Sequence, residues 1–451
     1  MGLKTSKIYT YFRLLTVALL CISVYGSLVG FGFTSKFDTI LVIVSLYSLL
    51  ITSSFSPSIL SPTVMCTISF YSATLPALLG IAIGFDNNYS IIRAEELYLW
   101  KLLFCYTVLY VLFSIGCDRY YNNKAPRRQK IFSNIPALLS INVYTLGAIF
   151  IFITLARFYS QYGATISFQN ISQGYLSRSG SGALIILQDM TFFYIVASLN
   201  VAIHQRHYCP SLKCLKISAK RVLLISGIIL SMLTSFSKAL IPSYALYLSS
   251  CRLFFARFRF VYIFFAPIFI ALFLGFHILR DPNGRFDLVN LAGYFNTLML
   301  GLDCSRNCET PDFITVLLPV NKLLNAIGLD FLSSSSFFDV SAYLTSIYDP
   351  DAYLSGATQQ WPLTTDLDLS FQNNLLMYLP FLGITSAPSI LMYRRAVSSC
   401  SIVDITLYIP FFTGLFGQLR GSPFYWTFFY ILPAVFAVNL FYSRASSLKV
   451  R

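Results

Sequence analysis

Runs of roughly 20 apolar residues recur along almost the whole length of this sequence. An α-helix needs about 20 such residues to cross the hydrocarbon core of a bilayer. Because only 11% of the 451 residues are charged, a soluble protein of this length would lack the polar surface that it needs. The pattern therefore predicts an all-α polytopic membrane protein.

Hydropathy predicts about twelve transmembrane helices. The first apolar run, from Arg13 to Phe31, lacks a small-residue cleavage site, so we expect a membrane span there and not a signal peptide. The two spans between 221 and 251 are also compatible with one bent hairpin. The predicted spans are 12–31, 38–53, 63–84, 98–116, 135–156, 182–203, 221–235, 238–251, 260–279, 373–393, 402–418 and 423–442.

The charges predict which side of the membrane each loop faces. With both termini in the cytoplasm, most of the 32 lysines and arginines fall in internal segments, whereas Asp118 and Asp404 are the acidic residues there. This bias follows the positive-inside rule and accounts for the net charge of +14 without nucleic acid. We expect a multi-pass membrane protein with cytoplasmic termini, in contact with membrane lipid.

A smaller set of cations falls on the predicted outer side, where the positive-inside rule does not explain them. A cation at the end of a membrane helix either binds an anion or extends alone to the lipid headgroups. We predict that Lys238, Arg280, Arg285 and Arg420 converge on a polyanion such as a lipid diphosphate. The full set is Lys36, Arg93, Lys101, Arg157, Arg178, Lys238, Arg280, Arg285, Arg306, Lys322 and Arg420.

One predicted outer segment, 280–371, is much longer than a connector and separates the spans of 1–279 from those of 372–451. Apolar residues at helical spacing predict helix within 313–332, interfacial or re-entrant, with Pro319 and Gly328 as breaks. The part 333–370 is rich in Ser, Tyr and Asp, which suits a carbohydrate-binding surface or an ordinary solvated loop.

Carboxylates and aromatic residues supply candidates for substrate binding. Asp189 lies inside the span 182–203 and must be neutral or paired there, although proton-coupled transport would also use such a residue. The sequences "DPD" (349–351) and "DLD" (366–368) match a short metal-binding pattern of glycosyltransferases, but a carboxylate acting on a sugar hydroxyl is the favoured interpretation. The candidates are Tyr175, Arg178, Asp189, Asp366 and Asp368.

Other motifs add little chemistry. No Gly-rich phosphate loop, paired CxxC or HExxH occurs in the sequence, so we expect no metal and no cofactor. The sequence "CSRNC" (304–308) places two cysteines in the predicted outer loop, where they form either a structural disulfide or two free thiols.

The layout resembles the O-antigen polymerase family (Wzy-type) and, more distantly, the O-antigen ligases. Three short segments carry the resemblance: "SFSKALIPSYALYL" (235–248), with Lys where Arg is usual, "ILRDPNGR" (278–285) and "QLRGS" (418–422). The resemblance implies a GT-C-like, metal-independent glycosyltransferase of a bacterial inner membrane, with a partly helical periplasmic loop. Its substrate would be an oligosaccharide on undecaprenyl diphosphate, and a Wzz-type chain-length regulator would be its partner. Lys238, Arg280, Arg285 and Arg420 would then hold the leaving diphosphate.

Three other membrane functions remain as alternatives. A flippase for the same lipid-linked substrate would have a similar number of spans, but two related halves and short loops. An O-antigen ligase would carry a histidine in the large loop, and none is present there. A membrane acyltransferase would need an embedded histidine, for which His277 at the end of a span is a poor candidate.

Overall fold

The computed structural model describes nine segments of the chain, together with single residues such as Gln188 and Gly421. Every regular element within these segments is helical, in agreement with the predicted all-α fold. The predicted spans 12–31, 38–53, 182–203, 221–235, 260–279 and 423–442 lie wholly or almost wholly outside them. The segments are 56–70, 94–124, 143–162, 240–256, 297–325, 339–354, 361–372, 374–400 and 402–419.

Two helical stretches, Trp100–Lys124 and Leu375–Ser399, are long and apolar enough to cross a membrane. The first combines α4 (Ala94–Phe113), the π-helical turn η1 (Ser114–Asp118) and α5 (Arg119–Lys124). The second is α18, and both coincide with predicted spans. The described part of the chain thus supports a helical membrane protein, while the number of twelve spans stays a prediction.

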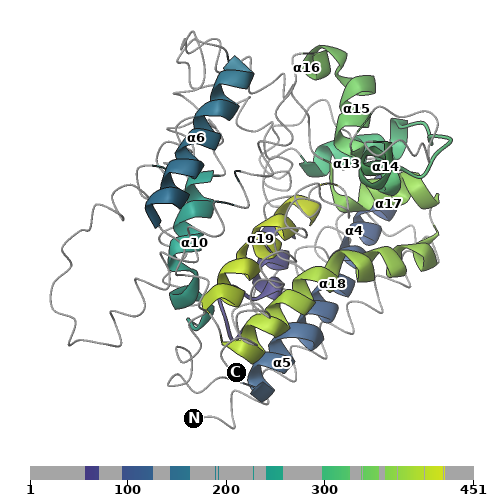
Figure 1. Ribbon diagram of the computed structural model, residues 1–451. Coiled ribbons are helices and arrows are strands. Elements are labelled where there is room, and N and C mark those ends of the chain that lie inside the picture. Colours follow the sequence, from purple (N-terminus) through teal and green to yellow (C-terminus); the bar gives the residue numbers. More distant parts are fainter. Residues whose placement is uncertain are drawn as a thin grey trace, which may run out of the picture.

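Four helices pack into a bundle (Figure 1). Helix α18 runs alongside α4 and returns through Cys400, whose φ of 51° reverses the chain, into α19 (Ile402–Leu419). Helix α10 (Leu240–Phe254) packs on α19. Prolines inside α18 and α19 are tolerated because neighbouring helices can satisfy the backbone groups that they free.

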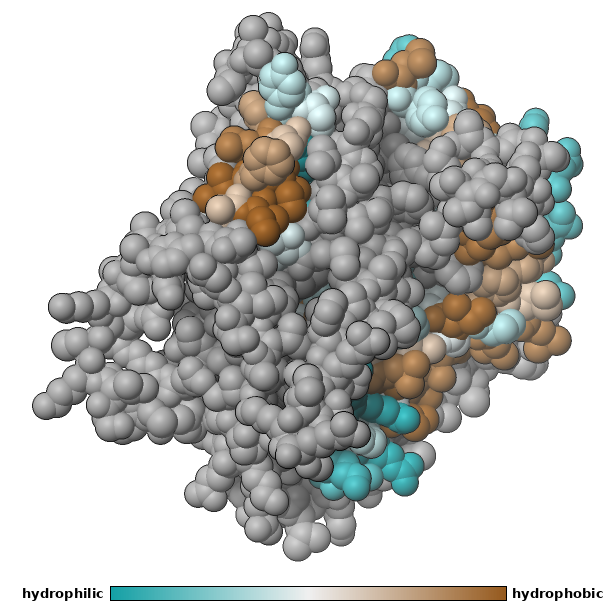
Figure 2. Space-filling model, viewed as in Figure 1, coloured by the Kyte–Doolittle hydropathy of each residue, from teal (hydrophilic) through white to brown (hydrophobic). Residues whose placement is uncertain are grey.

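The two candidate spans differ in their surroundings. Of an apolar stretch of 18 residues in each helix, 78% is buried in α4 and its continuation, against 33% in α18. Helix α4 is therefore central and α18 is peripheral. Leu376, Leu379 and Leu391 of α18 are exposed, and Figure 2 shows a hydrophobic surface where this helix runs. Helix α6 (Val143–Tyr162) exposes Phe152 and Tyr159 in the same way. Lipid acyl chains would cover such faces in a bilayer.

One end of the bundle gathers segments that the charge pattern assigns to the cytoplasmic side. The Ile59 N–H donates to Ala256 O at 2.9 Å, which joins the segment before the 62–70 helix to the end of α10. At the same end, Arg394 Nε donates to Gly116 O at 2.6 Å. Helix ends that the charge pattern assigns to the cytoplasmic side of the membrane therefore lie together in the structure.

The opposite end carries a compact helical unit, here called the cap (297–371), at the upper right of Figure 1. It has a small core of its own, which contains Cys304, Leu344 and Trp361. Asp339 caps α15 by accepting from the Ala342 N–H at 2.8 Å. The helices of the cap are α13 (Thr297–Asn307), η5 (Thr315–Leu317), α14 (Leu318–Asn325), α15 (Val340–Tyr348), α16 (Pro350–Leu354) and α17 (Leu363–Phe371).

The cap corrects two details of the sequence interpretation. Pro319 does not break a helix but is the second residue of α14, where the first turn needs no intrahelical N–H donor. The "DPD" and "DLD" sequences do not lie in an open loop: the first enters α16 and the second lies within α17. The predicted helix in 313–332 is confirmed over 315–325, and Gly328 lies outside the described residues.

Two glycines give a matched test of how the cap packs on α4. A Cβ at Gly301 of α13 would overlap the Tyr98 hydroxyl, whereas a Cβ at Gly383 of α18 would meet no atom within 4 Å. We expect Gly301→Ala to lower the unfolding free energy by about 1–3 kcal/mol. Gly383→Ala is expected to raise it by up to about 1 kcal/mol through helix propensity.

Thermal unfolding of the purified protein in detergent measures both effects. The variant Tyr98→Phe should relieve part of the Gly301→Ala cost, because it removes the atom that the new Cβ would meet first. Equal effects of the two glycine substitutions would contradict the close α13–α4 contact.

Candidate functional site

A buried ion pair fastens the cap to the bundle. Lys101 of α4 donates to both carboxylate oxygens of Asp368 in α17, at 2.8 and 2.9 Å. The Tyr378 hydroxyl of α18 donates to the same carboxylate at 2.9 Å. The side chains of Lys101 and Asp368 are 6% and 17% exposed, so little water screens the pair. Helix α4 therefore meets the consecutive helices α17 and α18, far from it in the sequence, at one carboxylate.

The second carboxylate of the "DLD" sequence points elsewhere. Asp366 is fully buried and accepts from the Thr315 hydroxyl at 2.5 Å, within the cap. Residues two apart on a helix project from different faces, which explains why Asp366 and Asp368 have different partners. Within the described residues, no group of histidine, cysteine and acidic side chains is arranged to hold a metal ion. Substrate binding by either carboxylate stays a prediction.

Tyrosines of α4 hold both the cap and the end of α19. The Tyr98 hydroxyl hydrogen-bonds the Thr365 hydroxyl at 2.6 Å, and the Tyr106 hydroxyl donates to Leu419 O at 2.9 Å. Gly421 is buried, and a Cβ there would lie 3.9 Å from Ser341 Oγ at the start of α15. Of the two residues that flank position 420 in "QLRGS", Leu419 thus lies against α4 and Gly421 lies against the cap.

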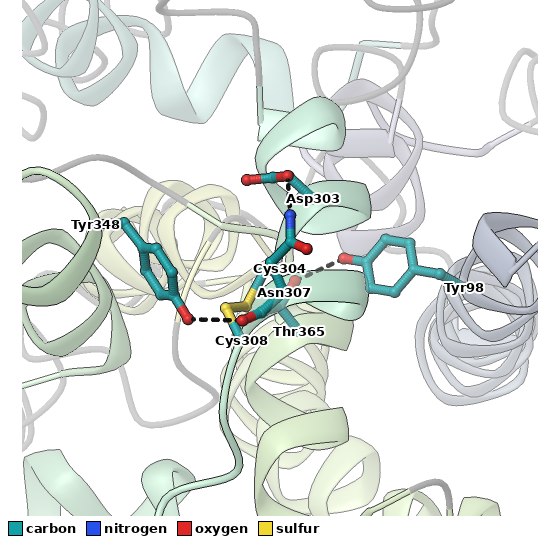
Figure 3. The surroundings of a disulfide bond; sticks show 7 residues. All are labelled: Tyr98, Asp303, Cys304, Asn307, Cys308, Tyr348 and Thr365. Atoms are coloured by element: carbon teal, nitrogen blue, oxygen red, sulfur yellow. Dashed lines mark hydrogen bonds between the residues drawn. A yellow bond between two sulfur atoms is a disulfide. The ribbon is translucent and has the colours of Figure 1, made fainter. Parts of the chain in front are cut away.

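A disulfide joins Cys304 and Cys308 at the end of α13, as the sequence had suggested as one of two possibilities. Figure 3 shows Tyr348 on one side of it and the Tyr98–Thr365 contact on the other. The Tyr348 hydroxyl donates to Asn307 O at 3.3 Å. Because Cys304 is a core residue of the cap within α13, the disulfide holds Cys308, the residue that follows α13, against that core.

The disulfide predicts the compartment of the cap. Disulfides persist in oxidising compartments such as the periplasm, so we expect the cap outside the cytoplasm. After mild reduction of intact spheroplasts, a membrane-impermeant maleimide should label two further thiols per chain. The variant Cys304→Ala/Cys308→Ala should show no such increase. Labelling that appears only after the membrane is permeabilised would contradict this orientation.

Acidic and phenolic side chains lie on the same unit as the disulfide. Partial burial is the main reason that the pKa of Tyr343 and of Tyr348 is raised above the ordinary value, and the negative charge of Glu309 adds to it. Both phenols therefore stay protonated at neutral pH. Exposed carboxylates of Asp303, Glu309 and Asp312 lie on the same unit. Such a surface offers donors and acceptors to carbohydrate hydroxyls.

The sequence interpretation missed a buried polar cluster at the other end of the bundle. Asp118 was counted as an ordinary loop carboxylate, but it is only 2% exposed. It accepts hydrogen bonds from the hydroxyls of Ser56, Ser61 and Thr63, at 3.2, 2.6 and 2.9 Å. The closely spaced serine and threonine residues of "SPSILSPT" (56–63) were the sequence feature that could have indicated this cluster.

Most of the predicted site residues lie outside the described segments. The structure therefore does not test whether the four predicted diphosphate-binding cations converge, nor the three substrate-binding candidates of the 175–189 region. Lys101, one of the outer cations, is described and pairs with Asp368. The residues outside are Tyr175, Arg178, Asp189, Lys238, Arg280, Arg285 and Arg420.

Comparison with family models, with curated proteins and with solved structures finds no match to this chain in any of the three. The case for a function therefore depends on the residues and on their arrangement.

Proposed function

We propose that the protein is a polysaccharide polymerase of the O-antigen type, acting at the periplasmic face of a bacterial inner membrane. It would transfer a growing glycan from undecaprenyl diphosphate to a hydroxyl of an incoming lipid-linked repeat unit. The observation that carries the proposal is the cap, a disulfide-bonded unit fixed at one end of apolar helices by the buried Lys101–Asp368 pair.

The proposed reaction needs few groups. The acceptor hydroxyl attacks the anomeric carbon, the bond from that carbon to the diphosphate oxygen breaks, and the hydroxyl proton passes to a base. Diphosphate leaves readily, so the main task is to hold it and to stabilise its developing charge. Lys238, Arg280, Arg285 and Arg420 are proposed for that role, and a carboxylate of the cap is proposed as the base.

A flippase is the main competing proposal. Alternating access commonly relies on two related halves that rock around a central site. A well-packed unit attached late in the chain, with its own core, adds an asymmetric element that such motion does not need. A fixed outer unit suits an enzyme that binds a glycan above the membrane, which favours the polymerase.

Deletion of the gene in its own strain tests the proposed class. Gel electrophoresis of the surface polysaccharide should then show the core with a single repeat unit and no ladder of longer chains. Complete loss of repeat units would point to a flippase or a ligase and would contradict the proposal.

The proposed diphosphate site has its own test. Arg280→Ala, Arg285→Ala and Arg420→Ala should each leave the protein in the membrane but reduce long chains by at least about tenfold, since a lost charged contact is worth about 1.5–3 kcal/mol. Arg252→Ala, at an exposed position near the end of α10, serves as the control and should leave the ladder intact. Normal ladders from all three variants would remove the diphosphate site from the proposal.

A further inference from the structure

Arg157 is the single charged residue of α6. It lies in α6 between Ala156 and Phe158, slightly more than one turn before the end of the helix at Tyr162. Its side chain is partly buried, and its Nε is shielded from solvent without a hydrogen-bond partner. Within the described residues, the ion pairs are Lys101–Asp368 and Arg395–Asp404, so no described carboxylate neutralises Arg157.

Neutral side chains hold the guanidinium in place. Arg157 Nη1 donates to Gln188 Oε1 at 2.7 Å. Gln188 Nε2 in turn donates to the Thr154 hydroxyl at 3.3 Å, and that hydroxyl donates to Phe150 O at 2.8 Å. Gln188 and Thr154 are 4% and 1% exposed. This chain of buried hydrogen bonds fixes the orientation of the arginine, and no carboxylate among the described residues compensates its charge.

This arrangement differs from an arginine that serves only to anchor a helix. A snorkelling side chain keeps its whole head group in water or among headgroups and needs no fixed partner. Arg157 instead has one edge bound to a buried amide, while the guanidinium retains further N–H donors for a second partner. A planar guanidinium held in this way favours bidentate contact with a phosphate group.

We infer that Arg157 binds a phosphate group of the lipid-linked substrate, with Gln188 as its positioning residue. The inference rests on the proposed function for the identity of the substrate, which would be an isoprenyl diphosphate. The same chemistry could come from an ordinary phospholipid headgroup, and the experiment must separate the two sources. Arg157 would add to the cations proposed above, because the charge pattern assigns this end of α6 to the outer side.

Binding of farnesyl diphosphate to the full-length protein in phosphatidylcholine nanodiscs provides the first test. We expect Arg157→Gln to weaken binding at least about tenfold, because it removes a charge-assisted contact. Arg157→Lys should retain part of the affinity, since the charge remains but the fork of donors is lost. Arg252→Gln, which changes an exposed arginine of α10, should bind like the wild type.

Gln188→Glu separates a binding role from a structural one. It keeps an acceptor for Arg157 but adds a negative charge that neutralises the guanidinium, and the Thr154 hydroxyl must donate to the new carboxylate because the donation from Gln188 Nε2 is lost. We expect farnesyl diphosphate binding to fall at least about tenfold while thermal stability is kept, since the new ion pair offsets the lost neutral contacts. A purely structural role of the Arg157–Gln188 contact predicts unchanged binding.

Three outcomes of the farnesyl diphosphate assay would overturn the inference. These are wild-type affinity in Arg157→Gln, equal losses in Arg157→Gln and Arg252→Gln, and unchanged binding in Gln188→Glu. A further outcome concerns the lipid. If Arg157→Gln keeps diphosphate binding and loses only the stabilisation of the protein by added phosphatidylglycerol, Arg157 binds a lipid headgroup and the inference is wrong. The proposed function is tested separately. If Arg157→Gln loses diphosphate binding while deletion of the gene removes all surface repeat units, Arg157 remains a phosphate ligand but the polymerase is rejected.

Discussion

Lys101→Ala is expected to destabilise the protein by about 3–5 kcal/mol and to abolish long polysaccharide chains. Removing one partner of a buried ion pair leaves the other charge buried and unpaired, which costs about this much. Here the stranded group is Asp368, whose remaining contact from the Tyr378 hydroxyl cannot neutralise it. Because the pair joins α4 to α17, its loss should also loosen the cap. Thermal unfolding in detergent and the length of the surface polysaccharide measure the two effects.

Two controls separate the charge from the packing. In Lys101→Met/Asp368→Leu, no charge is stranded, and most of the lost stability should return. Tyr378→Phe removes a single hydrogen bond to a charged group and should cost about 1.5–3 kcal/mol. If Lys101→Ala were no worse than Tyr378→Phe, the ion pair would not be the attachment that we describe.

The second large effect is expected for Asp118→Ala. The substitution removes the acceptor of three buried hydroxyls from the 56–63 segment, and each unsatisfied polar group costs about 1–3 kcal/mol. Some hydroxyls can turn to other acceptors, as Ser56 does toward Ser58 O at 3.2 Å, so we expect a total of about 3 kcal/mol. Unfolding of the purified protein measures the loss.

Asp404 offers the matched control at the same end of the bundle. It pairs with Arg395 at 2.9 Å, but the arginine side chain is 41% exposed, and such pairs contribute at most about 1 kcal/mol. Asp404→Ala should therefore be mild. Equal losses in Asp118→Ala and Asp404→Ala would show that the hydroxyl cluster is not a principal contact of this end.

Local sequence patterns predicted the described helices of the bundle, because hydrophobicity over about 20 residues is a local property, but they did not predict α13, α15, α16 and α17 of the cap. The predicted spans 98–116, 373–393 and 402–418 correspond to α4 with η1, to α18 and to α19. Their ends differ by a few residues, as at α18, which continues to Ser399. Hydropathy underestimates such extensions when a helix passes beyond the apolar region, since helix ends depend on capping and packing.

Tertiary partners could not be predicted in the same way. Lys101 was recognised as an outer cation, yet its partner Asp368 lies 267 positions away and was interpreted as a substrate ligand. Asp118 looked like a loop carboxylate, because nothing local shows that three hydroxyls from 56–63 would enclose it. Asp366 and Asp368 of the "DLD" sequence were both candidates for substrate binding, but the helical register of α17 gives them different partners within the protein.

The central claim is tested most directly by the purified protein and its proposed substrate. The full-length protein in nanodiscs would be incubated with an oligosaccharide repeat unit on undecaprenyl diphosphate, prepared from the same strain. We predict lipid-linked products that carry two or more repeat units, with one undecaprenyl diphosphate released for each new linkage. Intact substrate, or substrate moved across the bilayer without a new glycosidic bond, would contradict the account.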